Sequence, residues 1–206
     1  MGLYRDHVLP RLINVACAAG PAVGPLRDRV CAPLTGEVVE IGFGSGLNVP
    51  HYPAAVTGVT AVEPSDLAWR LADDRVSASR VPVRRAGLDG QRLPFEDDRF
   101  DSALSTWTMC TIPDLDAALA ELRRVLKPGG RLHFLEHGLA PDASVARWQH
   151  RLEPLQKRLA GGCHLTRRIA EQVGSAGFEL EDVDAFYEEG APKILGADTL
   201  GSARSA

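Results

Sequence analysis

Short apolar runs alternate with segments of helical periodicity through the middle of the chain. Each run is rich in β-branched residues and bounded by glycine, proline or polar residues, which is typical of a buried strand. Such strands are predicted at 37–42, 58–63, 81–86, 101–107 and 131–137. Because strands that alternate with helices form a parallel sheet covered on both faces, the pattern predicts a doubly wound α/β fold.

Apolar residues between these runs recur every three or four positions, which predicts amphipathic helices. Pro113 and Asp114 are favoured at the start of one helix, and Gly129 and Gly130 follow its end. Pro154 is expected to kink a longer helix because proline lacks a backbone N–H. Helices are predicted at 8–19, 25–32, 66–77, 113–125, 143–160 and 166–176.

The end of the chain has a different pattern. The segment FELEDVDAFYEEG, at 178–190, alternates apolar and acidic residues, as a half-exposed strand does. A last strand is predicted within 192–202. We therefore expect an antiparallel strand at the C-terminal edge of an otherwise mostly parallel sheet. No internal repeat or linker interrupts the chain, so residues 1–206 are predicted to form one domain.

Composition and charge exclude several classes of protein. The formal net charge of -4 and the pI near 5.9 give no general attraction to nucleic acid. No stretch approaches the roughly 20 apolar residues that span a bilayer. The four cysteines form no CxxC pair and show no zinc-ligand spacing, so we expect free thiols in the cytoplasm and no bound metal.

Three alternating glycines follow the first predicted strand in EVVEIGFGSGLNVPHYP. Gly42, Gly44 and Gly46 suggest a backbone that turns sharply or lies against a ligand. In a doubly wound sheet, ligands bind at the carboxyl ends of the strands, where this loop is placed. Glu40 precedes the glycines, and Glu63 ends the second strand, where a carboxylate is positioned to bind a ribose diol.

The spacing of the glycines distinguishes between two kinds of cofactor-binding loop. Dinucleotide-binding loops follow G-x-G-x-x-G, but Leu47 stands where the third glycine is required. The pattern E-x-G-x-G-x-G, with Glu63 on the next strand, resembles the S-adenosylmethionine loop of class I methyltransferases, which have a Rossmann-like sheet. The segments GLDGQRLPFEDDRFDSALS and ELRRVLKPGGRLHFLEH extend the likeness over about residues 36–137.

This resemblance implies S-adenosylmethionine as cofactor and S-adenosylhomocysteine as product. In such enzymes an acidic residue after the third strand, here Asp89, meets the adenine together with the next backbone N–H, that of Gly90. The domain then divides into a helical cap (1–35), a cofactor-binding half (36–137), a helical lid region (138–177) and C-terminal strands (178–206). The implied cofactor-binding residues are Glu40, Gly42, Gly44, Gly46, Asn48, Glu63, Pro64, Asp89, Gly90 and Thr106.

Several unusual segments narrow the resemblance. LYRDHVLPRL, IGFGSGLNVPHYP, STWTMCTIP, FLEHG, RWQHRLEPL and GGCHLTRRI together resemble bacterial relatives of the thiol S-methyltransferases called methyltransferase-like seven. The likeness spans nearly the whole chain. Animal members carry a hydrophobic N-terminal membrane anchor, whereas this sequence shows no such segment. The expected acceptor is therefore a small lipophilic thiol or sulfide.

Methyl transfer from a sulfonium is a direct displacement, for which orientation supplies about 7–11 kcal/mol of the barrier. His137, at the end of the fifth strand, is the candidate base. A structural histidine is the alternative for this residue. Methylation of oxygen, nitrogen or carbon in a quinone, phospholipid or natural product is the alternative reaction, and a cofactor-binding domain without turnover is the alternative to an enzyme. Candidate substrate-lining residues are Tyr52, Trp107, Cys110, Trp148 and Cys163.

The segment 143–160 has apolar residues on one face and several arginines and lysines elsewhere. Packing into the core is one interpretation of the apolar face, and a lid over an apolar substrate is the other. The basic residues here contrast with the acidic segment 179–189. This charge separation is typical of two solvated faces, although a basic face also suits peripheral contact with a membrane or an anionic substrate.

Overall fold

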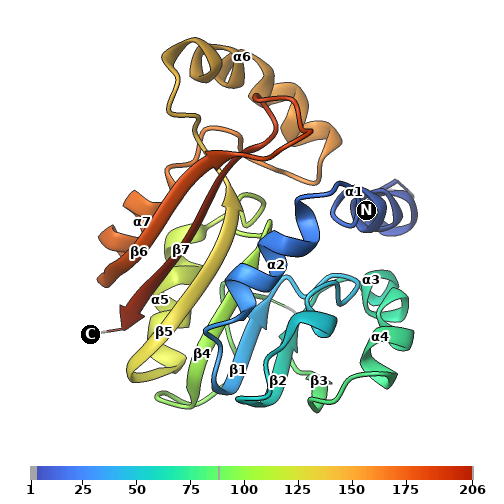
Figure 1. Cartoon of the computed structure of the whole chain (residues 1–206), viewed down its shortest axis with the longest axis vertical. Helices are drawn as coiled ribbons and strands as arrows, with labels where there is room; N and C mark the ends of the chain where they lie inside the picture. The colour runs from blue at the N-terminus through green and yellow to red at the C-terminus, as the bar shows by residue number, and fades with distance from the viewer. Residues whose placement is uncertain (1–3, 88, 206) are drawn as a thin grey trace.

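A seven-stranded sheet forms the centre of the protein (Figure 1). The computed structural model describes residues 4–87 and 89–205, so both ends of the predicted 1–206 domain lie outside the described residues. The strand order is β3-β2-β1-β4-β5-β7-β6. The strands are β1 (Gly36–Ile41), β2 (Val56–Val62), β3 (Val83–Arg85), β4 (Phe100–Thr106), β5 (Leu126–His137), β6 (Phe178–Tyr187) and β7 (Ala197–Ser205).

Strands β1 to β5 pair in parallel, whereas β7 pairs antiparallel with both β5 and β6. The α/β fold with antiparallel C-terminal strands is thus confirmed. The last strand, predicted within 192–202, extends further, to Ser205, and lies inside the sheet, so β6 forms the edge. The chain order reverses between β1 and β4, and ligands of such sheets bind at the carboxyl ends beside this switch point.

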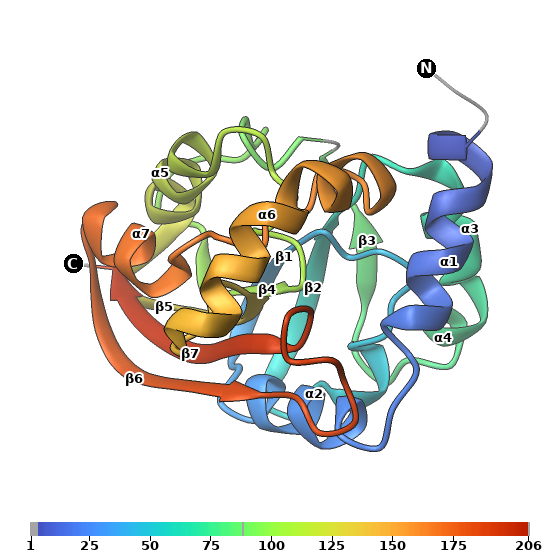
Figure 2. The ribbon, with the colours of Figure 1, turned by 90° about the horizontal axis from the view of Figure 1, so that it is seen from above.

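Helices cover both faces of the sheet (Figure 2). One core cluster joins the sheet to α5 and α7, and a second joins its other face to α2. The helices are η1 (Tyr4–Val8, a π-helix), α1 (Leu9–Ala16), α2 (Val23–Cys31), η2 (Val49–His51, a 3₁₀ helix), α3 (Asp66–Leu71), α4 (Asp73–Ser77), α5 (Leu115–Val125), α6 (Ala143–Leu159) and α7 (Ile169–Ser175). The single helix predicted over 66–77 is therefore two short ones.

Helix α5 shows how the sequence fixes local structure. Its apolar stripe is buried, and the Asp114 side chain caps the helix by accepting a hydrogen bond from Ala117 N at 3.0 Å. At its other end, the predicted turn around Gly129 lies within β5. Pairing with β4 shifts there, because Phe100 pairs with Leu126 and Ser102 with Arg131.

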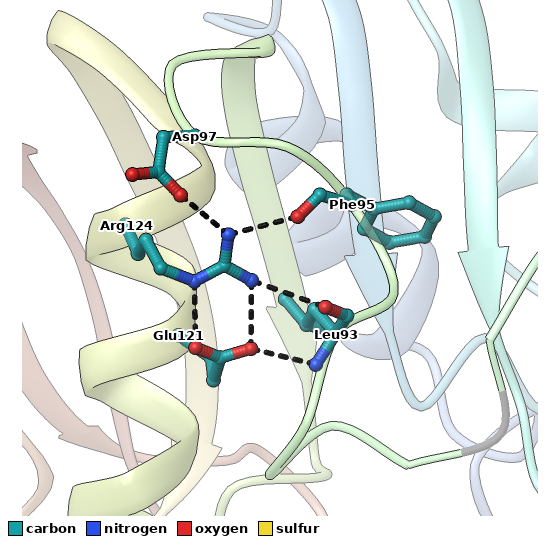
Figure 3. Close-up of polar contacts among 5 residues, drawn as sticks. All are labelled: Leu93, Phe95, Asp97, Glu121 and Arg124. Atoms are coloured by element: carbon teal, nitrogen blue, oxygen red, sulfur yellow. Dashed lines mark hydrogen bonds and ion pairs between the residues drawn. The ribbon is translucent and has the colours of Figure 1, made fainter.

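Arg124, on α5, forms hydrogen bonds and an ion pair with the loop before β4 (Figure 3). Its guanidinium binds both oxygens of Glu121, at 2.7 and 2.8 Å, and Asp97 Oδ1 at 2.7 Å. It also donates to the carbonyls of Phe95 and Leu93, at 2.8 and 3.0 Å. Because Arg124 lies at the end of α5 and this loop leads into β4, these contacts hold the loop against the helix near the amino ends of β4 and β5.

The amphipathic faces of α1 and α6 are largely exposed. In α6 the Trp148 and Leu155 side chains are 52% and 55% exposed, and Gln149 is its buried residue. Packing of this face into the core, one of the two sequence interpretations, is therefore wrong. In Figure 1, α6 stands beyond the end of the sheet at which β5 finishes. Within residues 4–87 and 89–205, no helix combines the length and apolar character that a bilayer crossing requires.

Candidate functional site

A cavity of about 460 Å³ opens at the carboxyl ends of β1, β2 and β4. This volume lies within the range of small-molecule sites. Its wall comes from the loop after β1, the end of β2, the loop after β3 and the start of the loop after β4, with α1 on the outer side. The predicted residues in this wall are Gly42, Gly44, Asn48, Glu63, Pro64, Asp89, Gly90, Thr106 and Trp107.

The glycine loop adopts backbone angles that other residues rarely adopt. Gly42, Gly44 and Gly46 have φ values of +67°, +59° and +73°. A Cβ on Gly42 would lie 2.0 Å from Thr108 Oγ1, so this position excludes any side chain. A Cβ on Gly44 would meet nothing closer than 3.8 Å. Gly42 is therefore required by packing, while Gly44 leaves space open beside the cavity.

Glu63 connects the loop to the second strand. Its Oε2 accepts a hydrogen bond from Gly44 N at 2.7 Å, and its Oε1 accepts one from Ser65 N at 2.7 Å. Burial raises the pKa of Glu63, against the lowering effect of these N–H groups. Each carboxylate oxygen keeps a further lone pair, so Glu63 has acceptor capacity left for two hydroxyl groups.

Glu40 lies behind the loop, away from the cavity wall. It accepts hydrogen bonds from Asn48 Nδ2, at 2.9 Å, and from the Tyr52 hydroxyl. Burial raises the pKa of Glu40 to about 7. Neither Glu40, Tyr52 nor Gly46 is among the residues of the cavity wall. These three were predicted to meet cofactor or substrate, but the structure places them in support of Asn48 and the loop.

Asp89 also lies in the cavity wall. Its Oδ1 accepts hydrogen bonds from Gln91 N and Nε2, at 2.9 and 3.1 Å, and Gln91 in turn accepts from Asp114 N at 2.8 Å. This chain of bonds ties Asp89 to the cap of α5. Gly90 beside it is packed near Ile112 and Ile41, which make this part of the wall apolar.

Trp107 separates His137 from the cavity. Its φ of +48° is unusual for an aromatic residue, and its indole donates to Asp198 Oδ1 at 3.3 Å. The ring centroids of Trp107 and His137 are 6.2 Å apart. Trp107 lies in the cavity wall, whereas His137 does not. The geometry thus gives the candidate base no direct contact with the cavity, and its catalytic role stays a prediction.

His137 instead lies close to Cys110 and Cys163, two of the residues predicted to contact the substrate. Hydrogen bonding from Cys110, assisted by His137, lowers the pKa of Cys163 despite its burial. Burial alone would lower the pKa of His137, but the bond to Cys163 and the charge of Asp198 raise it. Neither cysteine belongs to the cavity wall, and Trp148 is exposed on α6.

Comparison with known proteins shows the family and the fold. A family model described as "Methyltransferase domain" matches residues 39–134. Human thiol S-methyltransferase TMT1A is 30% identical over 172 residues, which cover 78% of this chain and 69% of that protein. The chain belongs to the class I S-adenosylmethionine-dependent methyltransferases.

Other methyltransferases are similar over comparable lengths. The demethylmenaquinone methyltransferase of Mycolicibacterium paratuberculosis is 39% identical over 171 residues, covering 78% of this chain and 71% of that protein. Rat thiol S-methyltransferase TMT1B is 34% identical over 147 residues, covering 68% of this chain. The chain matches 59% of the length of that rat protein. Different acceptors therefore occur among relatives of this chain.

Solved structures show the same fold at low identity. A Bacillus halodurans protein described as a putative methyltransferase superposes with a TM-score of 0.70 at 17% identity, covering 90% of this chain and 99% of that one. The [4+2]-cyclase SpnF superposes with a TM-score of 0.72 at 19% identity, covering 98% and 94%. At these identities, the likeness extends to the fold alone.

Sequence reasoning missed one charged residue of the cavity wall. Arg27 is 4% exposed and lies in the cavity wall. It donates to Asn48 Oδ1 and to Cys17 O at 3.0 Å, and its guanidinium stacks 4.8 Å from the Trp107 ring centroid. The signal was present in the sequence, since Arg27 shares the buried face of α2 with Val23 and Val30. An arginine on an apolar stripe indicates a buried polar partner or ligand.

Proposed function

We propose that this chain binds S-adenosylmethionine in the cavity at the carboxyl edge of the sheet and methylates a small lipophilic thiol or sulfide. The observation that carries the proposal is the bond between the Glu63 carboxylate and Gly44 N, which joins the two cofactor motifs in one cavity wall. When bound, the cofactor supplies an electrophilic methyl group.

The residues in the wall fit the parts of this cofactor. Glu63 has lone pairs for the ribose diol, and Asp89 with Gly90 is the proposed site of the adenine. The 42–46 loop is the proposed site of the methionine portion. Arg27 adds a cation at this end of the cavity, and among the described residues its buried Nε has no hydrogen-bond partner. A carboxylate would satisfy this donor, so Arg27 is the proposed partner of the methionine carboxylate.

Replacing Arg27 by methionine is expected to weaken S-adenosylmethionine binding about 10- to 100-fold, because a hydrogen bond to a charged group contributes about 1.5–3 kcal/mol. Isothermal titration calorimetry measures the Kd, and thermal unfolding reports whether the variant is folded. Arg29→Met is the matched control, because Arg29 lies on the same helix but pairs with Asp184 at the surface. Equal Kd values for a folded Arg27→Met and for Arg29→Met would remove Arg27 from the site.

The acceptor side of the proposal rests on the wall's apolar character and on the relatives. Ile13, Ile112 and Trp107 line the cavity and suit a lipophilic acceptor. A thiolate is a strong nucleophile that needs orientation and exclusion of water more than a strong base. This agrees with a cavity wall that does not include His137. Relatives named thiol S-methyltransferases, from rat and human, are 34% and 33% identical to this chain.

A quinone-type acceptor is the second candidate, because the demethylmenaquinone methyltransferase is 39% identical. A phospholipid acceptor has weaker support, from a Cereibacter sphaeroides phosphatidylethanolamine N-methyltransferase that is 29% identical over 104 residues. Exposed apolar side chains, such as Leu12 on α1 and Leu155 on α6, suit the approach of any lipophilic acceptor. Peripheral membrane contact and a cytoplasmic location stay predictions.

Release of S-adenosylhomocysteine with a panel of acceptors tests the proposal. The panel contains hydrogen sulfide, alkyl and aryl thiols, quinols, catechols and phosphatidylethanolamine. With thiols we expect turnover to rise about tenfold per pH unit below the pKa of the acceptor thiol, since the thiolate is the nucleophile. Acceptors of lower pKa should shift the profile to lower pH. Turnover confined to quinols or lipid would contradict the thiol assignment while leaving the cofactor site intact.

A further inference from the structure

Cys110, His137 and Cys163 bring two sulfur atoms and one imidazole nitrogen together at the carboxyl edge of the sheet. These donor atoms all lie within 4.8 Å of one another. Cys110 lies in the loop after β4, His137 ends β5, and Cys163 lies in the loop after α6. Although 27 and 26 residues separate them along the chain, the fold gathers the three side chains in one place.

The set of donors is one that thiophilic metal ions prefer. Zinc binds thiolate sulfur at about 2.3 Å and imidazole nitrogen at about 2.0–2.1 Å, so donors around it are about 3.3–3.8 Å apart. A small inward movement of the side chains would reach this spacing. We infer that Cys110, His137 and Cys163 form a Zn²⁺-binding site of the Cys₂His type. The fourth tetrahedral position is left for a water molecule.

The surroundings of the cluster suit a metal. Cys110 and Cys163 are 1% and 4% exposed, whereas the His137 side chain reaches solvent. Asp198 Oδ1 lies 3.6 Å from His137 Nε2, and the buried Asp198 Oδ2 has no hydrogen-bond partner among the described residues. A carboxylate beside a ligating histidine orients the ring and increases its basicity. Trp107 holds this carboxylate through Oδ1.

The charges also balance. Two thiolates contribute two negative charges, which Zn²⁺ neutralises when the thiol protons pass to solvent. The Glu136 carboxylate accepts hydrogen bonds from Ser105 Oγ, Thr108 N and Cys110 N. These bonds occupy the carboxylate, so we do not count Glu136 among the metal ligands. Arg167 faces the cluster, but its guanidinium is engaged with the carbonyls of Met109 and Ile112.

A metal here would connect the cluster to the cavity. Thr108 and Thr111 lie in the cavity wall on either side of Cys110, and Gly161 lies in the same wall just before Cys163. Crosslinking Cys110, His137 and Cys163 would therefore fix the two loops that border the cavity. This is a role in organising the site, and it does not depend on the nature of the acceptor.

Metal content tests the inference directly. The protein is expressed without a histidine tag, stripped with a chelator under reducing conditions, reloaded with Zn²⁺ and separated from free metal. We expect about one zinc ion per chain, measured by inductively coupled plasma mass spectrometry. Loading with Co²⁺ should give a sulfur-to-cobalt charge-transfer band and the intense visible bands of a tetrahedral site.

Cys163→Ser and His137→Gln should each lower zinc affinity by at least about 100-fold, measured in competition with a fluorescent chelator. The loss is expected to be this large because each variant removes a residue that binds the metal directly, whereas loss of a residue that only contacts a ligand costs about 10- to 100-fold. Cys31→Ala is the matched control, since this buried cysteine lies on α2, outside the cluster. If the ligand variants fail to fold, protection of Cys110 and Cys163 from alkylation by Zn²⁺ in the wild-type protein serves instead. Zinc content below a tenth per chain, unprotected cysteines, or unchanged affinity in folded variants would overturn the site.

Discussion

Glu63→Ala is expected to raise the Kd for S-adenosylmethionine about 30- to 150-fold. The proposed ribose contacts are two hydrogen bonds to a charged acceptor, and because water takes over part of these contacts in the alanine variant, the expected net loss is about 2–3 kcal/mol. The same carboxylate accepts hydrogen bonds from Gly44 N and Ser65 N, so the variant also loosens the glycine loop. Calorimetric titration with S-adenosylmethionine and with S-adenosylhomocysteine measures the effect, and both ligands should lose affinity to a similar extent.

The control for this prediction is Glu96→Ala. Glu96 is an exposed carboxylate in the loop before β4, so its removal changes the net charge equally without touching the cavity. Thermal unfolding of both variants separates a binding defect from a folding defect. If folded Glu63→Ala binds S-adenosylmethionine as tightly as Glu96→Ala does, the assignment of Glu63 to the ribose is wrong.

Gly42→Ala is expected to destabilise the fold by about 3–5 kcal/mol. The positive φ of Gly42 costs a Cβ-bearing residue about 1–2 kcal/mol. The added Cβ would also lie 2.0–2.6 Å from three atoms of the Thr108 side chain, whose displacement adds to the cost. Thr108 cannot turn away freely, because its hydroxyl donates to Thr106 O at 3.1 Å. Urea unfolding followed by circular dichroism measures the loss.

Gly44→Ala separates the two causes. Gly44 shares the positive φ, but a Cβ there would meet nothing closer than 3.8 Å. It should therefore cost only about 1–2 kcal/mol of stability. Because Gly44 lies in the cavity wall, this variant should lose affinity for S-adenosylmethionine while remaining folded. Equal losses of stability in the two variants would show that the contact with Thr108 is unimportant.

The sheet and part of the cavity wall were predictable because their signals are local. Strand periodicity, the glycine loop and Glu63 lie within one continuous stretch, and the fold places the loop and Glu63 in one cavity wall. Glu40 and Glu63 were harder to distinguish, since both are acidic residues beside the loop. The structure separates them because Glu40 points into a buried network with Asn48 and Tyr52, while Glu63 faces the cavity.

Two other features could not be predicted from local patterns. The Cys110, His137 and Cys163 cluster depends on which strand ends meet, and no spacing along the chain records that. The apolar face of α6 has the right period for a core helix, but periodicity does not state what covers the face. Trp148 and Leu155 have the spacing of buried residues, yet the structure leaves both side chains exposed.

The position of β7 has a consequence for how the chain folds during synthesis. Strand β7 is the last of the seven described strands to be synthesised, yet it lies between β5 and β6 rather than at the edge. Until residues 197–205 emerge, β5 lacks its outer neighbour and β6 has no partner in the sheet. Both would then present unpaired backbone groups to other nascent chains. Completion of the sheet therefore waits for the synthesis of β7, and the interval before it is the one in which β5 and β6 are most exposed to association with other chains.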